Sequence, residues 1–241
     1  MLVTHLDKNF MYWGELFVQS VHKYAPQESL YISGVNLSIE DIKQLETYHD
    51  KIEVKNHSLQ ADDLDSLHKV RKDMPSVWAV LLQGRISKVI LEVLEKDLAK
   101  DYFFLNADMF VRQPFSPLQK EVGLCLNSSH RHKSPHQLLN GVIGLRGGNT
   151  MVLEFALAYE EMHKKGLVVQ YDGKEEEFCI DYHGDQIHLY KIYKEYRNKL
   201  QFEEFIHDDF FTLENKKGKL WSAPRLEKER ALQQFRKALE C

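Results

Sequence analysis

Short apolar runs alternate with longer amphipathic stretches over the first part of the chain. Apolar runs at 2–4, 30–33 and 52–54 predict three strands. Between the first two runs, residues 10–24 carry apolar side chains at helical spacing, and Pro26 follows them. A second helix is predicted from Ser38, because Asp41 three residues later completes the pattern of a capping box. The order β-α-β-α-β is typical of an α/β sheet.

A run of four apolar or aromatic residues, 102–105, stands apart in the middle of the chain. It predicts a strand that is buried on both faces, like the inner strands of a parallel sheet. The run stops at Asn106 and Asp108, with the small Ala107 between them. Ligand sites of α/β sheets lie beyond the carboxyl ends of the strands, and hard cations bind carboxylate and carboxamide oxygens. Asn106 and Asp108 are therefore the first candidates for a functional site.

A long amphipathic helix is predicted between the third strand and this central run. Ser76 is its expected N-cap, and its apolar face is expected to pack on the sheet. We expect Gly84 and Arg85 to interrupt this helix near its start. Later in the chain, strands are predicted at 122–126 and 138–145, and helices at 150–165, 185–197 and 225–239. The last helix is expected at the surface, with Trp221 in a loop before it.

The composition is that of an ordinary globular protein of 241 residues, with 43% hydrophobic and 28% charged residues. A net charge of −4 offers no general attraction to nucleic acid or anionic lipid. No apolar run approaches the ~18 residues of a membrane-spanning helix, and the first residues lack the layout of a signal peptide. The three cysteines have no CxxC spacing and fit a reduced compartment. We expect one cytoplasmic domain without an integral membrane segment.

Three common motifs of nucleotide-binding proteins and hydrolases are missing from the chain. The first strand-to-helix turn, residues 5–9, contains no glycine, which excludes the dinucleotide-binding motif G-x-G-x-x-G. The phosphate loop G-x-x-x-x-G-K-[ST] and the nucleophile elbow G-x-S-x-G are absent as well. These absences narrow the range of α/β proteins to which the chain can belong.

Residues 105–111, LNADMFV, resemble the strand end L-D-A-D-x-x-V of nucleotide-sugar glycosyltransferases with the GT-A fold, such as the glycogenin and galactosyltransferase families. Other segments resemble these enzymes in the same order: 4–10 their opening nucleotide loop, 84–88 their basic helix segment, 139–146 their N-x-G-V strand and 184–189 their D-Q-x-x-L helix start. The resemblance implies an α/β, single-domain GT-A fold over residues 1–241, with a mostly parallel central sheet flanked by helices. About 1–126 would form the nucleotide-binding half, and about 127–241 the acceptor half with a C-terminal helix.

The resemblance also implies an activity and a set of site residues. The protein would transfer a sugar from a nucleotide-diphosphate donor, a uridine diphosphate sugar, to an unknown acceptor (a glycan, a lipid-linked molecule or a protein), with no nucleic acid as partner. The implied donor-binding residues are Thr4, His5, Leu6, Asn9, Arg85, Lys88, Asn106, Ala107, Asp108, Asn140 and Gly141. Asp185 and Gln186 would be the catalytic pair. Mn²⁺ or Mg²⁺ would be held by Asp108, Asn106 and His207.

The chemistry of the leaving group explains why such a site needs positive charge. A nucleoside diphosphate departs with negative charge, so a divalent cation that bridges its phosphates stabilises the transition state. Arg85 and Lys88 lie one helical turn apart and can face the same diphosphate, with ordinary solvent-facing charges as the alternative. Asn106 stands where these enzymes have their first aspartate, which removes one negative charge and should weaken the metal site. A strand-end turn held by Asx hydrogen bonds is the alternative for residues 106–108.

Alternatives stay open for the later candidates and for the whole protein. Asp185 would be the general base of an inverting enzyme, would position the sugar in a retaining one, or would only favour a helix N-terminus. Asp208 or Asp209 would serve equally well as the metal ligand in place of His207, and this acidic stretch would also suit a solvated loop. The histidine-rich stretch 130–136 fits a polar loop better than a zinc site. The competing functions are a nucleotide-sugar-binding protein without catalysis and, less favoured, a sugar-phosphate nucleotidyltransferase, which usually has a glycine-rich first loop.

Overall fold

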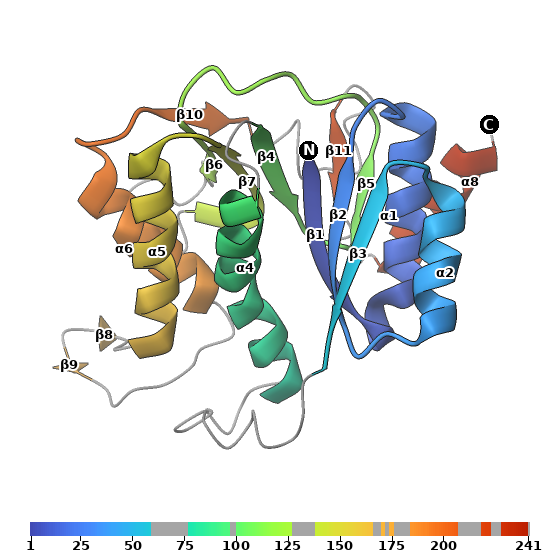
Figure 1. Ribbon diagram of the computed structural model, residues 1–241, viewed down its shortest axis with the longest axis horizontal. Helices are drawn as coiled ribbons and strands as arrows, with labels where there is room; N and C mark the ends of the chain where they lie inside the picture. The colour runs from blue at the N-terminus through green and yellow to red at the C-terminus, as the bar shows by residue number, and fades with distance from the viewer. Residues whose placement is uncertain are drawn as a thin grey trace.

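A seven-stranded sheet forms the centre of the protein, in the order β10-β6-β7-β4-β1-β2-β3 (Figure 1). The computed structural model describes residues 1–58, 77–96, 100–126, 138–165, 170–171, 174–175, 184–206, 218–222 and 228–240. The strands of the sheet are β1 (Leu2–Asp7), β2 (Leu30–Val35), β3 (Ile52–His57), β4 (Asp101–Leu105), β6 (Val122–Leu126), β7 (Leu138–Arg146) and β10 (Phe202–Phe205). Two smaller pairs are formed by β5 (Met109–Val111) with β11 (Leu220–Ser222) and by β8 (Gln170–Tyr171) with β9 (Lys174–Glu175).

The sheet is mostly parallel, as the alternation of strands and helices predicted. β1 pairs in parallel with β2 and β4, β2 with β3, and β10 with β6, whereas β7 runs antiparallel to both of its neighbours. Residues 102–105 of β4 are each no more than 4% exposed, which confirms the predicted burial on both faces. Only one neighbour of β4 is parallel, however. The strand is buried because helices cover both faces of the sheet, and this does not require that both neighbouring strands be parallel.

Helices cover both faces of the sheet (Figure 1). α1 (Met11–Tyr24) and α2 (Ile39–Tyr48) lie on one side, which we call the first face, and α8 (Lys228–Glu240) packs on α1. α4 (Val77–Lys96), α5 (Thr150–Lys165) and α6 (Gly184–Tyr196) lie on the second face. Among the helices that the structure describes, none is long and apolar enough to cross a membrane.

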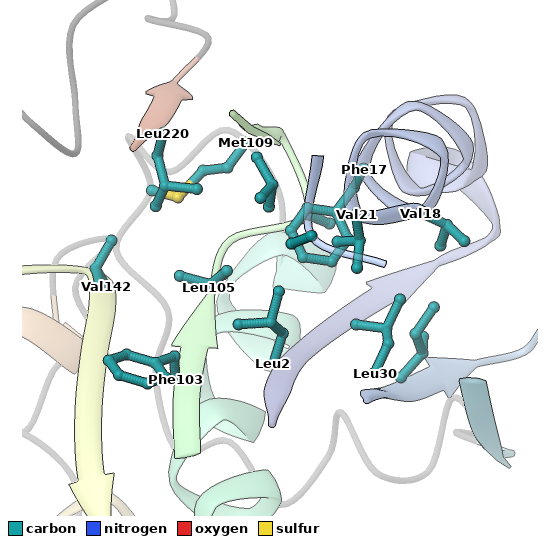
Figure 2. Packing of buried hydrophobic residues seen from close by; sticks show 14 of the residues in the cluster. Leu2, Phe17, Val18, Val21, Leu30, Phe103, Leu105, Met109, Val142 and Leu220 are labelled. Carbon is teal, nitrogen blue, oxygen red and sulfur yellow. The ribbon is translucent and has the colours of Figure 1, made fainter. Parts of the chain in front are cut away.

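Figure 2 shows how α1 packs on the first face. Phe17, Val18 and Val21 project from α1 toward the strands. The strand residues of the same buried cluster include Leu2, Leu30, Phe103, Leu105 and Val142. Because burying a side chain of this size contributes about 1.5–3 kcal/mol, the cluster holds α1 firmly over β1 and β4. The loop between β1 and α1 is thereby placed beside the end of β4.

Local signals within the helices were read correctly in one case and wrongly in another. The capping box of α2 is confirmed, since the Asp41 N–H donates to Ser38 Oγ at 3.1 Å and the Ser38 N–H donates to Asp41 Oδ2 at 2.8 Å. The expected interruption at Gly84 and Arg85 is wrong, because α4 is continuous across both. One glycine costs a helix only about 1 kcal/mol, less than the burial of Ile86 and the apolar residues that follow it.

The last part of the chain forms strands that the sequence pattern did not predict. β10 extends the sheet beside β6, and β11 pairs antiparallel with β5. Trp221, expected in a loop, therefore lies in β11 opposite Phe110. The C-terminal helix is also more than a surface element, because Ala231 and Phe235 of α8 are buried in one cluster with Trp221 and Trp13. These strands have only three or four residues, too few to show a period.

Candidate functional site

The end of β4 lies at the sheet edge where the parallel strands β1, β2 and β3 also end. Asn106, Ala107 and Asp108 follow β4 at this edge. The hydroxyl of Thr4, which is buried on β1, donates a 2.7 Å hydrogen bond to the carbonyl oxygen of Leu105. The candidate residue Thr4 is thus joined directly to the strand end that precedes Asn106.

Asn106 connects this edge to β7. Its N–H donates to the carbonyl oxygen of Gly141 at 3.1 Å, and its own carbonyl oxygen accepts from the N–H of Met109 at 3.2 Å. The bond from Met109 closes a tight turn over residues 106–109. Ala107, which lies within this turn, packs in the core of the first face. Three candidates from distant parts of the sequence, Thr4, Asn106 and Gly141, are therefore linked across β1, β4 and β7.

Asp108 lies beside a cation that sequence analysis did not find. Lys228, the first residue of α8, places its Nζ 3.8 Å from Asp108 Oδ2, with the two side chains 37% and 22% exposed. Burial raises the pKa of Asp108 above its ordinary range, and the positive charge of Lys228 acts in the opposite direction. The carboxylate at the end of β4 is consequently paired with an ammonium group from the C-terminal helix.

Two aromatic rings complete the surroundings of this ammonium group. Lys228 Nζ lies 5.1 Å from the ring centroid of Phe10 and 5.5 Å from that of Trp13. Both distances are within the range of cation–π attraction, which grows as the cation is desolvated. Phe10 and Trp13 belong to the turn and first helix that follow β1. The residues that follow β1, the end of β4 and the start of α8 therefore lie next to one another around Lys228 Nζ.

His5 lies within electrostatic range of Arg85 on α4. Burial lowers the pKa of His5 to about 4, the Arg85 guanidinium adds to this effect, and Asp7 opposes it. Arg85 itself is only 9% exposed. At neutral pH, His5 is therefore an uncharged imidazole next to a fixed positive charge, able to donate or accept a hydrogen bond.

Asp7 organises the loop after β1, although sequence analysis did not single it out. Its carboxylate accepts hydrogen bonds from the Phe10 N–H at 3.1 Å and from Asn9 Nδ2 at 2.9 Å. The signal was present, because an aspartate directly before a helical turn is a common N-cap, and Asp7 directly precedes the 3-10 helix Lys8–Phe10. Leu6 packs in the core against Gly14, where an added Cβ would lie 2.6 Å from a Leu6 methyl group. A donor could therefore contact Leu6 only through its backbone.

Lys88 has different surroundings from Arg85, although the two lie one turn apart on α4. It is exposed and lines a cavity of about 560 Å³ with residues of β2, β3, α4 and α5. Most of the other cavity charges are paired, as Lys55 is with Glu92 and Lys96 with Glu53. None of the candidates at the end of β4 lines this cavity.

The remaining candidates are described only in part. α6 begins at Gly184, so Asp185 and Gln186 lie in its first turn, as predicted, and α6 packs on β7. Gln186 is half-buried, while the side chain of Asp185 lies outside the described residues. The side chain of Asn140 and the whole of His207 also lie outside them, as does the histidine-rich stretch 130–136. Their roles stay predictions.

The described residues fit a divalent cation poorly. In sites that bind substrate phosphates, such an ion takes one or two carboxylates from the protein and completes its shell with phosphate and water oxygens, so the one carboxylate and one carboxamide at the end of β4 do not decide the question by number alone. No group of three His, Cys, Asp or Glu side chains within the described ranges is placed to hold a metal ion. The carboxylate that is present, Asp108, already faces the ammonium of Lys228. An ion held by Asp108, Asn106 and His207 stays a prediction, with His207 outside the described residues.

Comparisons with known proteins show the fold but no relative in sequence. No protein-family model and no curated protein sequence matches the chain. A solved structure of the galactosyltransferase LgtC in complex with donor and acceptor sugar analogs aligns with 10% identity and a TM-score of 0.59, covering 99% of this chain and 95% of LgtC. An active-site mutant of LgtC aligns with 11% identity and a TM-score of 0.59, covering 99% of this chain and 94% of that one.

A third solved structure, the bifunctional glycosyltransferase WbbM in its apo form, aligns with 9% identity and a TM-score of 0.59. The alignment covers 99% of this chain and 49% of WbbM, so the chain spans about half the length of that protein. At such low identities the likeness concerns the fold alone. The central, mostly parallel sheet flanked by helices is the GT-A-type fold of these glycosyltransferases.

Proposed function

We propose that the chain, which has the GT-A-type fold, is a glycosyltransferase that uses a nucleotide-diphosphate sugar, specifically a uridine diphosphate sugar, as donor. The observation that carries the proposal is the polar edge at the end of β4, where hydrogen bonds link Thr4 to Leu105 and Asn106 to Gly141. Solved glycosyltransferases that share the fold over 99% of the chain support it.

In the proposed reaction, an acceptor oxygen bonds to the anomeric carbon while the bond from that carbon to the β-phosphate oxygen breaks. The acceptor hydroxyl gives its proton to a base, and the nucleoside diphosphate leaves with the bonding electron pair. Arg85, buried beside His5, and Lys228, beside Asp108, supply positive charge at this edge of the sheet. Such fixed charge stabilises the leaving diphosphate more than the ground state.

The base is assigned by the same proposal. Asp185 at the start of α6 takes the acceptor proton if the enzyme inverts the anomeric configuration. If the enzyme retains the configuration, Asp185 and Gln186 position the sugar, and the acceptor proton passes to an oxygen of the leaving diphosphate. α6 packs on β7, the strand that carries Gly141, which supports a place for this pair near the acceptor.

A second candidate function is a nucleotide-sugar-binding protein that has lost catalysis. Asn106 favours it, because the carboxylate typical of active enzymes is missing from this position. Binding of the donor needs hydrogen bonds and positive charge, both of which the site offers. Catalysis needs in addition a positioned acceptor and base. Donor turnover therefore separates the two functions, whereas donor binding does not.

The test measures release of uridine diphosphate from uridine diphosphate glucose, galactose and N-acetylglucosamine, with Mn²⁺ and with a chelator. We expect release above the protein-free rate for at least one donor, because water can replace the acceptor. Arg85→Met should lower the release at least about tenfold, since it removes fixed charge from the leaving group. Arg197→Met, at an exposed position after α6, is the matched control and should retain activity.

Calorimetric titration with uridine diphosphate completes the test. Binding together with donor turnover supports the transferase. Binding without turnover of any donor supports the second candidate. If uridine diphosphate does not bind with either additive, the proposal of a uridine diphosphate sugar as donor is wrong.

A further inference from the structure

The ammonium group of Lys228 is held where a metal ion would have to bind. It lies 3.8 Å from Asp108 Oδ2 and faces the rings of Phe10 and Trp13. A divalent cation that used this carboxylate would meet an existing positive charge at close range. Like charges repel most strongly in partly desolvated surroundings such as these. The Asp108 carboxylate therefore pairs with the Lys228 ammonium group, and this ammonium group disfavours the binding of a metal ion at the same place.

Lys228 is the first described residue of α8. The described interactions of its ammonium group come from outside the helix, from Asp108 and the two aromatic rings. The side chain is therefore directed at the edge of the sheet.

The position of Lys228 is fixed by the way α8 docks on the protein. Ala231 and Phe235, one and two turns further along, are buried in the aromatic cluster. The other end of α8 is bound by α1, because the Tyr24 hydroxyl donates to the Ala238 carbonyl oxygen at 2.7 Å and Lys23 Nζ donates to that of Leu239 at 2.9 Å. A group anchored in this way costs little entropy to order when a ligand binds.

The charges at the end of β4 also match a single ammonium group. Asn106 in place of a carboxylate leaves Asp108 as the acidic side chain of the 106–108 turn. One carboxylate is enough to hold one ammonium, whereas the motif that this segment resembles offers a divalent ion two carboxylates. Lys228 keeps 37% of its side chain exposed, and an ammonium has three N–H donors. It can therefore pair with Asp108 and still donate to phosphate oxygens.

We infer that Lys228 supplies the positive charge that a divalent cation supplies in metal-dependent enzymes, so that a nucleoside diphosphate binds at this edge of the sheet without metal. The inference rests on the proposed function for the identity of the ligand. It departs from the Mn²⁺ or Mg²⁺ that the motif resemblance implies. Its observable consequences are that binding of the diphosphate tolerates a chelator and depends on Lys228.

The first experiment titrates uridine diphosphate into the full chain by calorimetry, in the presence of a chelator and then of Mn²⁺. We expect wild-type affinities that agree within about twofold, because the charge is supplied by the protein. Lys228→Met should weaken binding in chelator about tenfold or more, as expected when one side of a charge pair is lost. Lys228→Arg should keep part of the affinity, and Lys237→Met, exposed on the same helix, should keep all of it.

A second experiment does not depend on the nucleotide. Free Mn²⁺ is followed by electron paramagnetic resonance as protein is added. The wild type should bind Mn²⁺ only weakly, and Lys228→Met should bind it more tightly, because the competing ammonium is gone. Thermal unfolding of each variant shows whether it is folded.

The outcomes separate the two proposals. Binding of uridine diphosphate that requires Mn²⁺, or that is unchanged in Lys228→Met, overturns the inference but leaves the transferase in place. If uridine diphosphate does not bind at all, the donor proposal fails. The Mn²⁺ titration then tests by itself whether Lys228 opposes metal binding at Asp108. Tight Mn²⁺ binding by the wild type that Lys228→Met does not improve would overturn the inference in that case too.

Discussion

The two faces of the sheet satisfy their buried polar groups in different ways. On the first face, polar side chains bond to the backbone: Ser20 Oγ donates to the Phe17 carbonyl oxygen at 2.6 Å and accepts from the Val111 N–H at 2.9 Å. On the second face, buried and half-buried polar side chains bond to each other. Ser87 of α4 donates to Glu160 of α5, and the Nδ1 atoms of His163 and His188 lie 2.9 Å apart between α5 and α6.

The difference determines how each face responds to change. A hydroxyl that bonds to the backbone, such as that of Ser20, does not titrate, and its backbone partner cannot be removed by substitution. A pair of side chains is lost when one member is replaced, and a pair of histidines is lost when both take up a proton. The first face should therefore be sensitive mainly to lost packing, and the second face also to lost partners and to pH.

The largest effect is expected from Phe235→Ala, which empties the aromatic cluster beneath α8. Phe235 is fully buried, with its ring centroid 4.8 Å from that of Phe110. Loss of its contacts should lower the free energy of unfolding by about 3–5 kcal/mol, as measured by urea denaturation. The exposed Lys237→Ala should change it by less than about 0.5 kcal/mol. Equal effects of the two substitutions would contradict the packing described here.

A smaller loss is expected from Ser87→Ala on the second face. The substitution removes a donor from the buried Glu160 carboxylate. Weakening the hydrogen bonding of a buried polar group typically costs about 1–3 kcal/mol, again measured by urea denaturation. Glu160→Gln retains an oxygen acceptor for Ser87 and should cost less. If Ser87→Ala is neutral, the pair does not hold α4 against α5.

The smallest effect, per unit of pH, concerns His163 and His188. Burial lowers the pKa of each from its ordinary 6.5, with Lys88 adding to the effect at His163, and His163 and Lys191 adding to it at His188. The unfolded chain therefore takes up protons first as the pH falls below about 6.5. The contribution of these two histidines to stability should be constant above that value and fall below it, by on the order of 1 kcal/mol per pH unit for each histidine.

Urea denaturation between pH 5 and 8 measures this dependence. His163→Gln should reduce the slope below pH 6.5, because one of the two titrating groups is gone. His22→Gln, at an exposed position of α1 on the first face, is the matched control and should leave the slope unchanged. His5, whose pKa burial lowers to about 4, contributes a slope of its own, so a slope that neither His163→Gln nor His188→Gln reduces is the result that would contradict the prediction.

Much of the architecture could be predicted because its signals are local. The four strands β1 to β4 and the helices α1, α2, α4 and α5 each show a period or a cap within their own residues. The edge that carries Asn106 and Asp108 could also be predicted, because a buried apolar run ends abruptly there. Strands β10 and β11 could not, since segments this short are stabilised by the neighbours with which they pair.

The amino-acid sequence by itself determined the α/β layering, the burial of β4 and the polar turn at its end. Those features follow from the spacing of apolar and polar residues, which the chain carries locally. Only the tertiary structure decided which charge stands beside Asp108. Lys228 has no local pattern that points to it, and it reaches the site because aromatic packing docks α8 on α1. Contacts between residues distant in sequence depend on how complete helices and strands pack. The spacing of apolar and polar residues within one element does not determine those contacts.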